Sequence, residues 1–382
     1  MWAGAGFIVG AVIILYSLVC YPVFLAVWRR RAAPPVRKDM GFRTTVSTVM
    51  AVHDGEQFIR AKLESLLALR YPAGLLDILV VSDGSTDGTD RIVESFASRG
   101  VRLLRVPRGG KAAALNAGLE LSSGEILFFT DVRQPLDPDA LSHLVANFAD
   151  PSVGVVTGEL RIAGPDSTGE QHDLGLYWRY ELWARRRHSD IDSTFVATGC
   201  IYAIRRSLAE PLPADTLTDD AVMPLRAFFR GYRAIFDSQA IAFDYPSADE
   251  GVEFRRRLRT LAGLWQVCIR MPWLFTRANR MRLHFLSHKF SRLALPWAIV
   301  LVVIASVVMD ASPFRSVLLI VEAFVAALAL VDLLVPRTFP LKRITSPAHT
   351  FLSMNAAALL SVSVFFVQPA MLWRTTRVKV RP

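Results

Sequence analysis

Hydrophobic and polar positions divide the chain of 382 residues into apolar ends and a mixed middle. Residues 4–28 contain no charged side chain, and residues 293–309 and 316–335 are almost as apolar. Because about 20 apolar residues cross a bilayer as a helix, we expect three membrane spans. Residues 351–372 are diluted by polar side chains, so we expect a re-entrant or interfacial segment there.

The middle of the chain alternates short apolar runs with amphipathic stretches. The runs predict strands at 44–52, 76–81, 101–106, 125–130 and 153–161. The stretches between them predict helices at 56–68, 87–98 and 111–121, and one that ends near residue 148 after Asp137 as N-cap. This alternation indicates an α/β domain with a Rossmann-like sheet, inserted between transmembrane helices.

Charge adds a membrane-facing segment to this picture. The formal net charge is +10, and ten basic side chains with no acid lie in residues 255–292, interleaved with aromatic and aliphatic positions. Basic amphipathic helices lie in the membrane interface and attract anionic lipids. The segment runs directly into an apolar span, which favours membrane lipids over nucleic acid as its partner. We therefore expect an N-terminal span at 1–28, a soluble domain at 42–250, interface helices at 251–292 and a C-terminal membrane region at 293–372.

The soluble domain is expected in the cytosol, because five basic residues follow the first span at positions 29–38 and positive charge collects on the cytoplasmic side. A hydrophobic share of 52% excludes a disordered chain. Three scattered cysteines are too few for a disulfide framework or a zinc site.

Several acidic side chains lie at the ends of predicted strands or at the start of a predicted helix. Asp83 and Asp131 each follow a predicted strand, and open α/β sheets bind ligands beyond the carboxyl ends of their strands. Lys111 opens a predicted helix, where a phosphate would be favoured, although the spacing of a nucleotide-binding phosphate loop is missing. Asp219 and Asp220 precede a helical run, so they are candidates both for an N-cap and for a general base.

The order of these motifs resembles family 2 glycosyltransferases of the membrane-anchored kind, related to cellulose, hyaluronan and poly-N-acetylglucosamine synthases. The resemblance covers about residues 44–292. It rests on Ala51-Val52-His53-Asp54-Gly55-Glu56, Ser82-Asp83-Gly84-Ser85-Thr86-Asp87, Gly110-Lys111-Ala112-Ala113-Ala114-Leu115-Asn116, Thr130-Asp131-Val132-Arg133-Gln134, Gly199-Cys200-Ile201-Tyr202-Ala203-Ile204-Arg205-Arg206 and Thr218-Asp219-Asp220.

The resemblance implies a GT-A type domain that binds a nucleotide sugar, with a UDP-sugar expected. Asp83 would read the uracil ring, with Ala51 and His53 lining the base pocket. Lys111 would contact ribose or phosphates, and Asp131 would lie near ribose and a Mg²⁺ or Mn²⁺ ion.

On the acceptor side, the resemblance assigns Gly199 and Arg205 to the border of the acceptor site. Asp219 would help to bind substrate, and Asp220 would be the general base. Arg256 and Arg259 are candidates for meeting the charge of the leaving diphosphate.

Two positions depart from the family pattern. Arg133 replaces the second acid of the family's Asp-x-Asp motif, and a guanidinium cannot hold a metal. Either Asp131 alone holds the metal, or Arg133 itself neutralises the leaving group. The run Arg256-Arg257-Leu258-Arg259-Thr260 keeps only the arginine of the processive enzymes' Gln-x-x-Arg-Trp motif.

The sequence therefore predicts an inverting glycosyltransferase of the inner plasma membrane that transfers sugar to a saccharide or lipid-linked acceptor in polysaccharide synthesis. Two alternatives stay open. One is single-sugar transfer to a polyprenyl-type lipid carrier, and the other is a non-catalytic scaffold that binds a nucleotide sugar.

Overall fold

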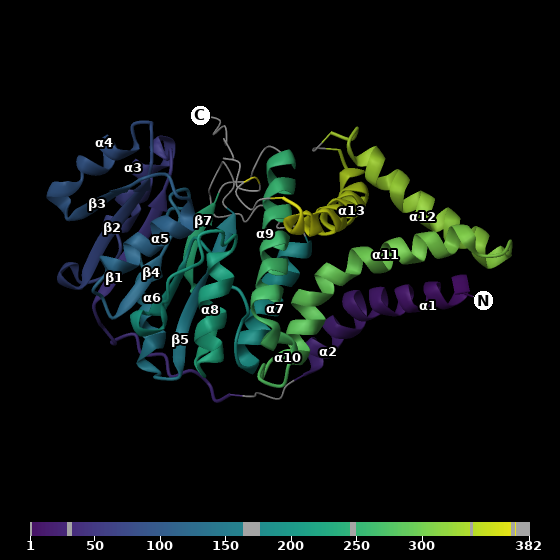
Figure 1. The fold of residues 1–382 in the computed structure, drawn as a ribbon, viewed down its shortest axis with the longest axis horizontal. Helices are drawn as coiled ribbons and strands as arrows, with labels where there is room; N and C mark the ends of the chain where they lie inside the picture. Colours follow the sequence, from purple (N-terminus) through teal and green to yellow (C-terminus); the bar gives the residue numbers. More distant parts are fainter. Residues whose placement is uncertain are drawn as a thin grey trace. The chain divides into compact units, whose positions relative to one another are not determined.

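The chain forms two compact units. The computed structural model describes residues 2–28, 33–162, 176–244, 250–336, 339–367 and 371. One unit spans Arg30–Pro246, and the other combines Met1–Arg29 with Ser247–Pro382 (Figure 1).

The first unit is built on a seven-stranded mixed sheet in the order β3-β2-β1-β4-β6-β5-β7. Strands β3, β2, β1 and β4 run parallel, whereas β6 is antiparallel to both β4 and β5, and β5 pairs with β7 in parallel. The strands are β1 Val46–Val52, β2 Leu76–Asp83, β3 Val101–Val106, β4 Ile126–Phe129, β5 Val153–Ile162, β6 Tyr202–Arg205 and β7 Arg233–Asp244.

Helices pack on both faces of this sheet. On one face, apolar side chains of α3 Glu56–Leu67, α4 Thr89–Glu94 and α6 Ala140–Ala146 share a buried core with inward residues of the strands. On the other face, α5 Lys111–Glu120 approaches so closely that a Cβ on Gly118 would lie 2.5 Å from the side chain of Val49. Helices α7 Leu176–Ile191 and α8 Asp219–Phe229 complete the unit.

The predicted α/β class is confirmed, and each predicted strand lies within two residues of an observed one. The helix expected to be capped by Asp137 is α-helical from Ala140, after a turn. The Asp137 carboxylate accepts the backbone N–H of Asp139 at 2.9 Å, which is the contact expected of an N-cap. Strands β6 and β7 were not predicted.

The second unit is helical. Among its described residues, four helical segments are long and apolar enough to cross a membrane by length and composition: Trp2–Val27, Arg282–Val308, Pro313–Asp332 and Lys342–Phe365. Its elements are α1 Trp2–Leu15, η1 Tyr16–Cys20, α2 Tyr21–Val27, α9 Glu250–Arg270, η6 Pro272–Phe275, α10 Arg282–His284, η7 Phe285–Phe290, α11 Ser291–Val308, α12 Pro313–Asp332, α13 Lys342–Leu360 and η8 Ser361–Phe365.

Two of these helical segments begin nine or more residues earlier than expected, where polar side chains find partners. The segment predicted from residue 293 starts at Arg282, where His284 Nδ1 lies 3.0 Å from the hydroxyl of Tyr21. The segment predicted from residue 351 starts at Lys342, whose ammonium lies 2.9 Å from a carboxylate oxygen of Asp332. Residues 368–370 and 372 of that prediction lie outside the described part of the chain.

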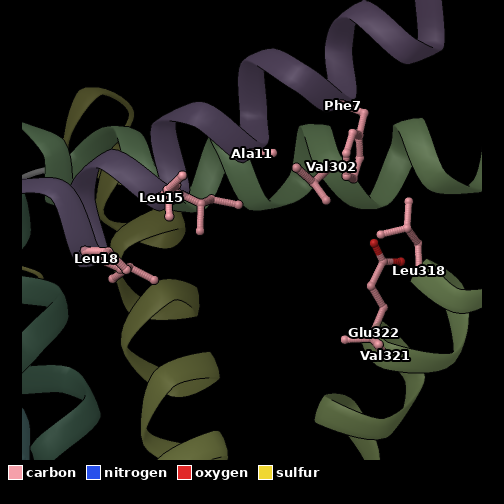
Figure 2. A pocket seen from close by; sticks show the side chains of 10 residues that line it. Phe7, Ala11, Leu15, Leu18, Val302, Leu318, Val321 and Glu322 are labelled. Carbon is pink, nitrogen blue, oxygen red and sulfur yellow. The ribbon is translucent and has the colours of Figure 1, made fainter. Parts of the chain in front are cut away.

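An apolar groove of about 350 Å³ lies between α1, η1, α11 and α12 (Figure 2). Glu322 is its acidic lining residue, and the carboxylate of Glu322 accepts a hydrogen bond of 2.8 Å from the hydroxyl of Ser306. This contact satisfies one oxygen of an acid that lies within a helix apolar enough to cross a membrane.

Close packing at Gly124 generates a stability prediction. A Cβ at this position would lie 2.5 Å from the backbone nitrogen of Ser47. Because overpacking strains the core, Gly124→Ala should lower the free energy of unfolding by about 1–3 kcal/mol. We expect the thermal midpoint of the purified protein in detergent to fall by about 2–4 °C for each kcal/mol. Gly74→Ala is the control, because no heavy atom lies within 4 Å of its Cβ position. Equal midpoints for the two variants would contradict this packing.

Candidate active site

The parallel strands bring their carboxyl ends to one edge of the sheet. His53 follows β1 directly, and its Nδ1 lies 2.9 Å from the carbonyl oxygen of Asp83, the last residue of β2. Ala51 pairs in register with Val81 on the neighbouring strand. The three residues expected to line one pocket therefore lie together at this edge.

The carboxylate of Asp83 is buried and held by the loop that precedes α5. Its side chain is 3% exposed and accepts the backbone N–H groups of Gly109 at 2.7 Å and Gly110 at 3.0 Å. Arg108 forms an ion pair with the same carboxylate. Arg108 was not among the predicted site residues, although a cation beside two glycines before a helix is a usable signal.

Lys111 connects this loop to the acidic residues. It is the first residue of α5, and its ammonium lies 2.9 Å from Asp131 and 3.2 Å from Asp219. Burial acts to lower the pKa of Lys111, but Asp131, Asp219 and Asp220 outweigh it and raise the pKa above its ordinary value. The lysine is therefore held as a cation between acids that are far apart in the sequence.

Asp220 lies beside this cluster in the first turn of α8. Burial raises the pKa of Asp220 to about 6, with Asp219 adding to the shift and Lys111 opposing it. Gly199 faces the carboxylate so closely that a Cβ there would lie 3.1 Å from Asp220 Oδ2. A side chain at position 199 would crowd this carboxylate, so glycine leaves space in front of a carboxyl group suited to exchanging protons near neutral pH.

Two further side chains support the acids and were missed by sequence reasoning. The hydroxyl of Tyr202 donates to Asp219 Oδ2 at 3.4 Å, and burial followed by the charge of Asp219 raises the pKa of Tyr202 well above its ordinary value. Arg185 donates to Thr198 Oγ1 at 2.8 Å and favours the ionised form of Asp220. Tyr202 stands within the quoted 199–206 motif, whereas Arg185 gave no signal that separated it from its basic neighbours.

Arg133 is engaged by a partner that the sequence did not indicate. Its guanidinium lies 2.5 Å from Asp244, the last residue of β7, and Gln134 Nε2 donates to the same carboxylate at 3.0 Å. Asp244 therefore balances the charge of Arg133, which leaves less support for Arg133 as the group that neutralises an anionic ligand.

Arg205 does not belong to this edge. It pairs with Ile126, the first residue of β4, whereas Asp131 follows the last residue of β4. Its guanidinium donates to the carbonyl oxygens of Val153 and Phe148, both at 2.8 Å. We therefore correct the expectation for Arg205: it ties strands and turns together at the opposite end of the sheet.

Arg256 and Arg259 lie on α9 of the helical unit. Arg256 approaches Glu253 at 4.0 Å. Their assignment to the leaving group stays a prediction.

The charge balance bears on whether a metal fits. Among the described residues, no three His, Cys, Asp or Glu side chains form a group that could hold a metal ion. However, Asp131, Asp219 and Asp220 all act electrostatically on the ammonium of Lys111, and Arg185 also acts on Asp220, so three carboxylates face two cations. Carboxylate oxygens suit Mg²⁺ and Mn²⁺, and an anionic ligand would supply the remaining oxygens. The chemistry of these donors is therefore compatible with a divalent cation.

Comparisons with known proteins identify the family of the chain. The family described as "Glycosyl transferase family 2" matches residues 47–212, and "Glycosyl transferase family group 2" matches residues 133–336, more than half of the chain.

Two curated relatives are similar in sequence. A "Probable glycosyltransferase YdaM" of Bacillus subtilis is 27% identical over 67% of this chain and 63% of its own length. A "Poly-beta-1,6-N-acetyl-D-glucosamine synthase" of Staphylococcus epidermidis is 24% identical over 63% of this chain and 60% of its own length. The chain thus spans about three fifths of these relatives.

Among solved structures, the "Mannosyltransferase PcManGT from Pyrobaculum calidifontis in complex with GDP-Man and Mn2+" matches with a TM-score of 0.75. It is 24% identical, and the match covers 95% of this chain and 99% of that one. At this level of identity the match establishes the shared fold, which is of the GT-A type.

Proposed function

Because the chain belongs to the family 2 glycosyltransferases and is related to polysaccharide synthases, we propose that it transfers a sugar from a UDP-sugar to a hydroxyl of a saccharide or lipid-linked acceptor, with inversion. One observation carries the proposal. Asp83, Lys111, Asp131 and the pair Asp219 and Asp220 come from separate elements and meet at the carboxyl edge of the sheet.

The nucleotide would occupy the ends of β1 and β2. Asp83 presents a buried carboxylate that already accepts N–H donors, and the ring N–H of uracil is a donor of the same kind. Ala51 and His53 lie at the carboxyl end of the neighbouring strand β1 and would line the base pocket. Lys111 would contact ribose or phosphates from the first turn of α5.

The diphosphate needs positive charge, because it leaves with developing negative charge and electrostatic stabilisation is usually the largest catalytic contribution. Asp131 would hold Mg²⁺ or Mn²⁺, which would supply that charge when bound. Lys111 adds a fixed cation that its acidic neighbours keep protonated.

Asp220 would accept the proton of the attacking acceptor hydroxyl. The hydroxyl oxygen forms its bond to the anomeric carbon from the face opposite the diphosphate, and the sugar–phosphate bond breaks. An α-linked donor therefore gives a β-linked product. A carboxylate whose pKa is about 6 is ionised at neutral pH and still basic enough to take the proton.

The location we propose is the inner plasma membrane, with the catalytic unit on the cytosolic side. Four helices with the length and composition of membrane spans support this, together with the basic segment 255–292, which would attract anionic headgroups. A membrane setting suits an acceptor that grows on, or is anchored to, the lipid surface.

Replacing the proposed base tests the function. Asp220→Asn keeps the size of the side chain but cannot accept a proton, so we expect transfer from a radiolabelled donor to fall about 10²–10⁴-fold while donor binding is kept. Glu120→Gln removes an equal charge from an exposed position on α5 and should leave the rate unchanged. Transfer by Asp220→Asn at the normal rate would overturn the assignment, and product length would distinguish polymerisation from single-sugar transfer.

The pKa of Asp220 also predicts a pH profile. The base is active when ionised, so kcat/KM should be about half maximal near pH 6 and fall about tenfold for each further pH unit below it. An aspartate with its ordinary pKa would stay active to about pH 4. Recovery of the full rate after return to pH 7.5 would exclude acid unfolding, and a flat profile down to pH 5 would contradict a raised pKa.

Removal of divalent metal distinguishes two possibilities. Either Asp131 holds a metal that meets the charge of the leaving diphosphate, or Arg133 meets that charge directly. We expect a chelator to abolish transfer, and Mn²⁺ or Mg²⁺ to restore it, because Asp244 already balances the charge of Arg133. Calorimetric titration of UDP with and without Mn²⁺ gives a second readout. Full transfer in the presence of chelator would show that side-chain cations alone meet the leaving group.

A further inference from the structure

Lys62 is a buried cation on the apolar face of α3. Its neighbours on that face, Ile59, Leu63 and Leu66, are fully buried in the core, and Lys62 itself is 1% exposed. Burying an ammonium is costly unless its hydrogen bonds are satisfied, so its partners indicate why a lysine occupies this position.

Both hydrogen bonds of Lys62 go to one short loop. Its Nζ donates to Thr130 Oγ1 at 2.6 Å and to the carbonyl oxygen of Gln134 at 2.5 Å. These acceptors are the two ends of the Asp131 loop, residues 130–134, which follows β4 and carries Asp131 and Arg133. The ammonium on α3 therefore holds both ends of the loop in place.

The same contacts continue to the segment beside the proposed base. Thr130 Oγ1 donates to the carbonyl oxygen of Cys200 at 2.7 Å. Cys200 follows Gly199, which faces the carboxylate of Asp220. One chain of hydrogen bonds thus connects Lys62, the Asp131 loop and the segment at Gly199.

We propose that Lys62 is a positioning residue that fixes the Asp131 loop relative to the Gly199 segment, and so sets the separation between the donor sugar and the base Asp220. The inference rests on the proposed function and deepens it. Lys62 touches neither substrate nor reacting atoms; it acts through Thr130 and Gln134. Catalysis is sensitive to such placement, because a displacement of about 1 Å can cost about 10²-fold in rate.

The arrangement holds in both protonation states of the lysine. Burial lowers the pKa of Lys62 to about 7, although the charges of Cys200 and Asp131 oppose the shift. A neutral amine keeps two N–H donors, which is the number that the two acceptors need.

The test is Lys62→Met, which keeps the length of an unbranched side chain and removes both donors. In the full chain in detergent, we expect kcat to fall about 10–100-fold while the dissociation constant for UDP changes by less than about threefold. Binding stoichiometry, measured by calorimetric titration of UDP, corrects the rate for any unfolded protein. Arg60→Met is the matched control, because it removes a cation from the exposed face of the same helix.

Thr130→Val supplies a second variant that breaks the connection to Cys200 at nearly constant volume, and it keeps the proposal testable if Lys62→Met folds poorly. The double variant should be no slower than the slower single variant, because both changes interrupt one chain of contacts. Rates within twofold of wild type for Lys62→Met and Thr130→Val, or independent effects that multiply, would overturn the proposal. Failure of the wild-type chain to transfer sugar from any donor would instead count against the proposed function.

Discussion

The ammonium of Lys111 is the contact around which the candidate site is organised. It lies between Asp131, which follows β4, and Asp219, which begins α8, so it joins parts of the chain more than 80 residues apart. Without this cation, three carboxylates would repel one another at one edge of the sheet. With it, Asp131 and Asp219 stay close. Burial and the charge of Asp219 raise the pKa of Asp220, and Lys111 opposes that shift.

The sheet explains why these groups can meet. Strands β1, β2 and β4 run parallel, so His53, Asp83 and Asp131 emerge at the same edge. Strand β6 runs antiparallel to β4, so the beginning of the 199–206 motif, and not its end, lies at that edge. Gly199 and Tyr202 lie on the side of the acids, while Arg205, three residues further along, has passed to the other end of the sheet.

Much of this arrangement could be predicted from the sequence, because the apolar runs end at the acids. Asp83 and Asp131 stand where buried strands stop, and the pair of glycines before Lys111 indicates a turn into a helix. Strand β6 was not predicted, so the resemblance assigned Arg205 to the border of the acceptor site without regard to the direction of the strand. Strand β7 was missed because polar residues such as Asp237 and Gln239 interrupt its apolar pattern.

Partners that come from distant parts of the sequence were beyond prediction for a simple physical reason. Arg133 depends on Asp244, and Lys62 depends on Thr130 and Gln134; neither pairing leaves a local pattern. Lys62 does interrupt the apolar spacing of α3, and a charge on a buried helix face is a usable sign of a tertiary contact. Local sequence patterns therefore predict the strands and helices, whereas the partners of buried charged side chains become apparent only once the fold is known.

The central claim is that the edge carrying Asp83, Lys111 and Asp131 binds the activated sugar. A cryo-electron microscopy or crystal structure of the full chain with UDP and Mn²⁺ tests this most directly. The account predicts uracil beside Asp83 and the diphosphate between Lys111 and Asp131, within reach of Asp220. Nucleotide bound at another surface, with this edge unchanged, would contradict it.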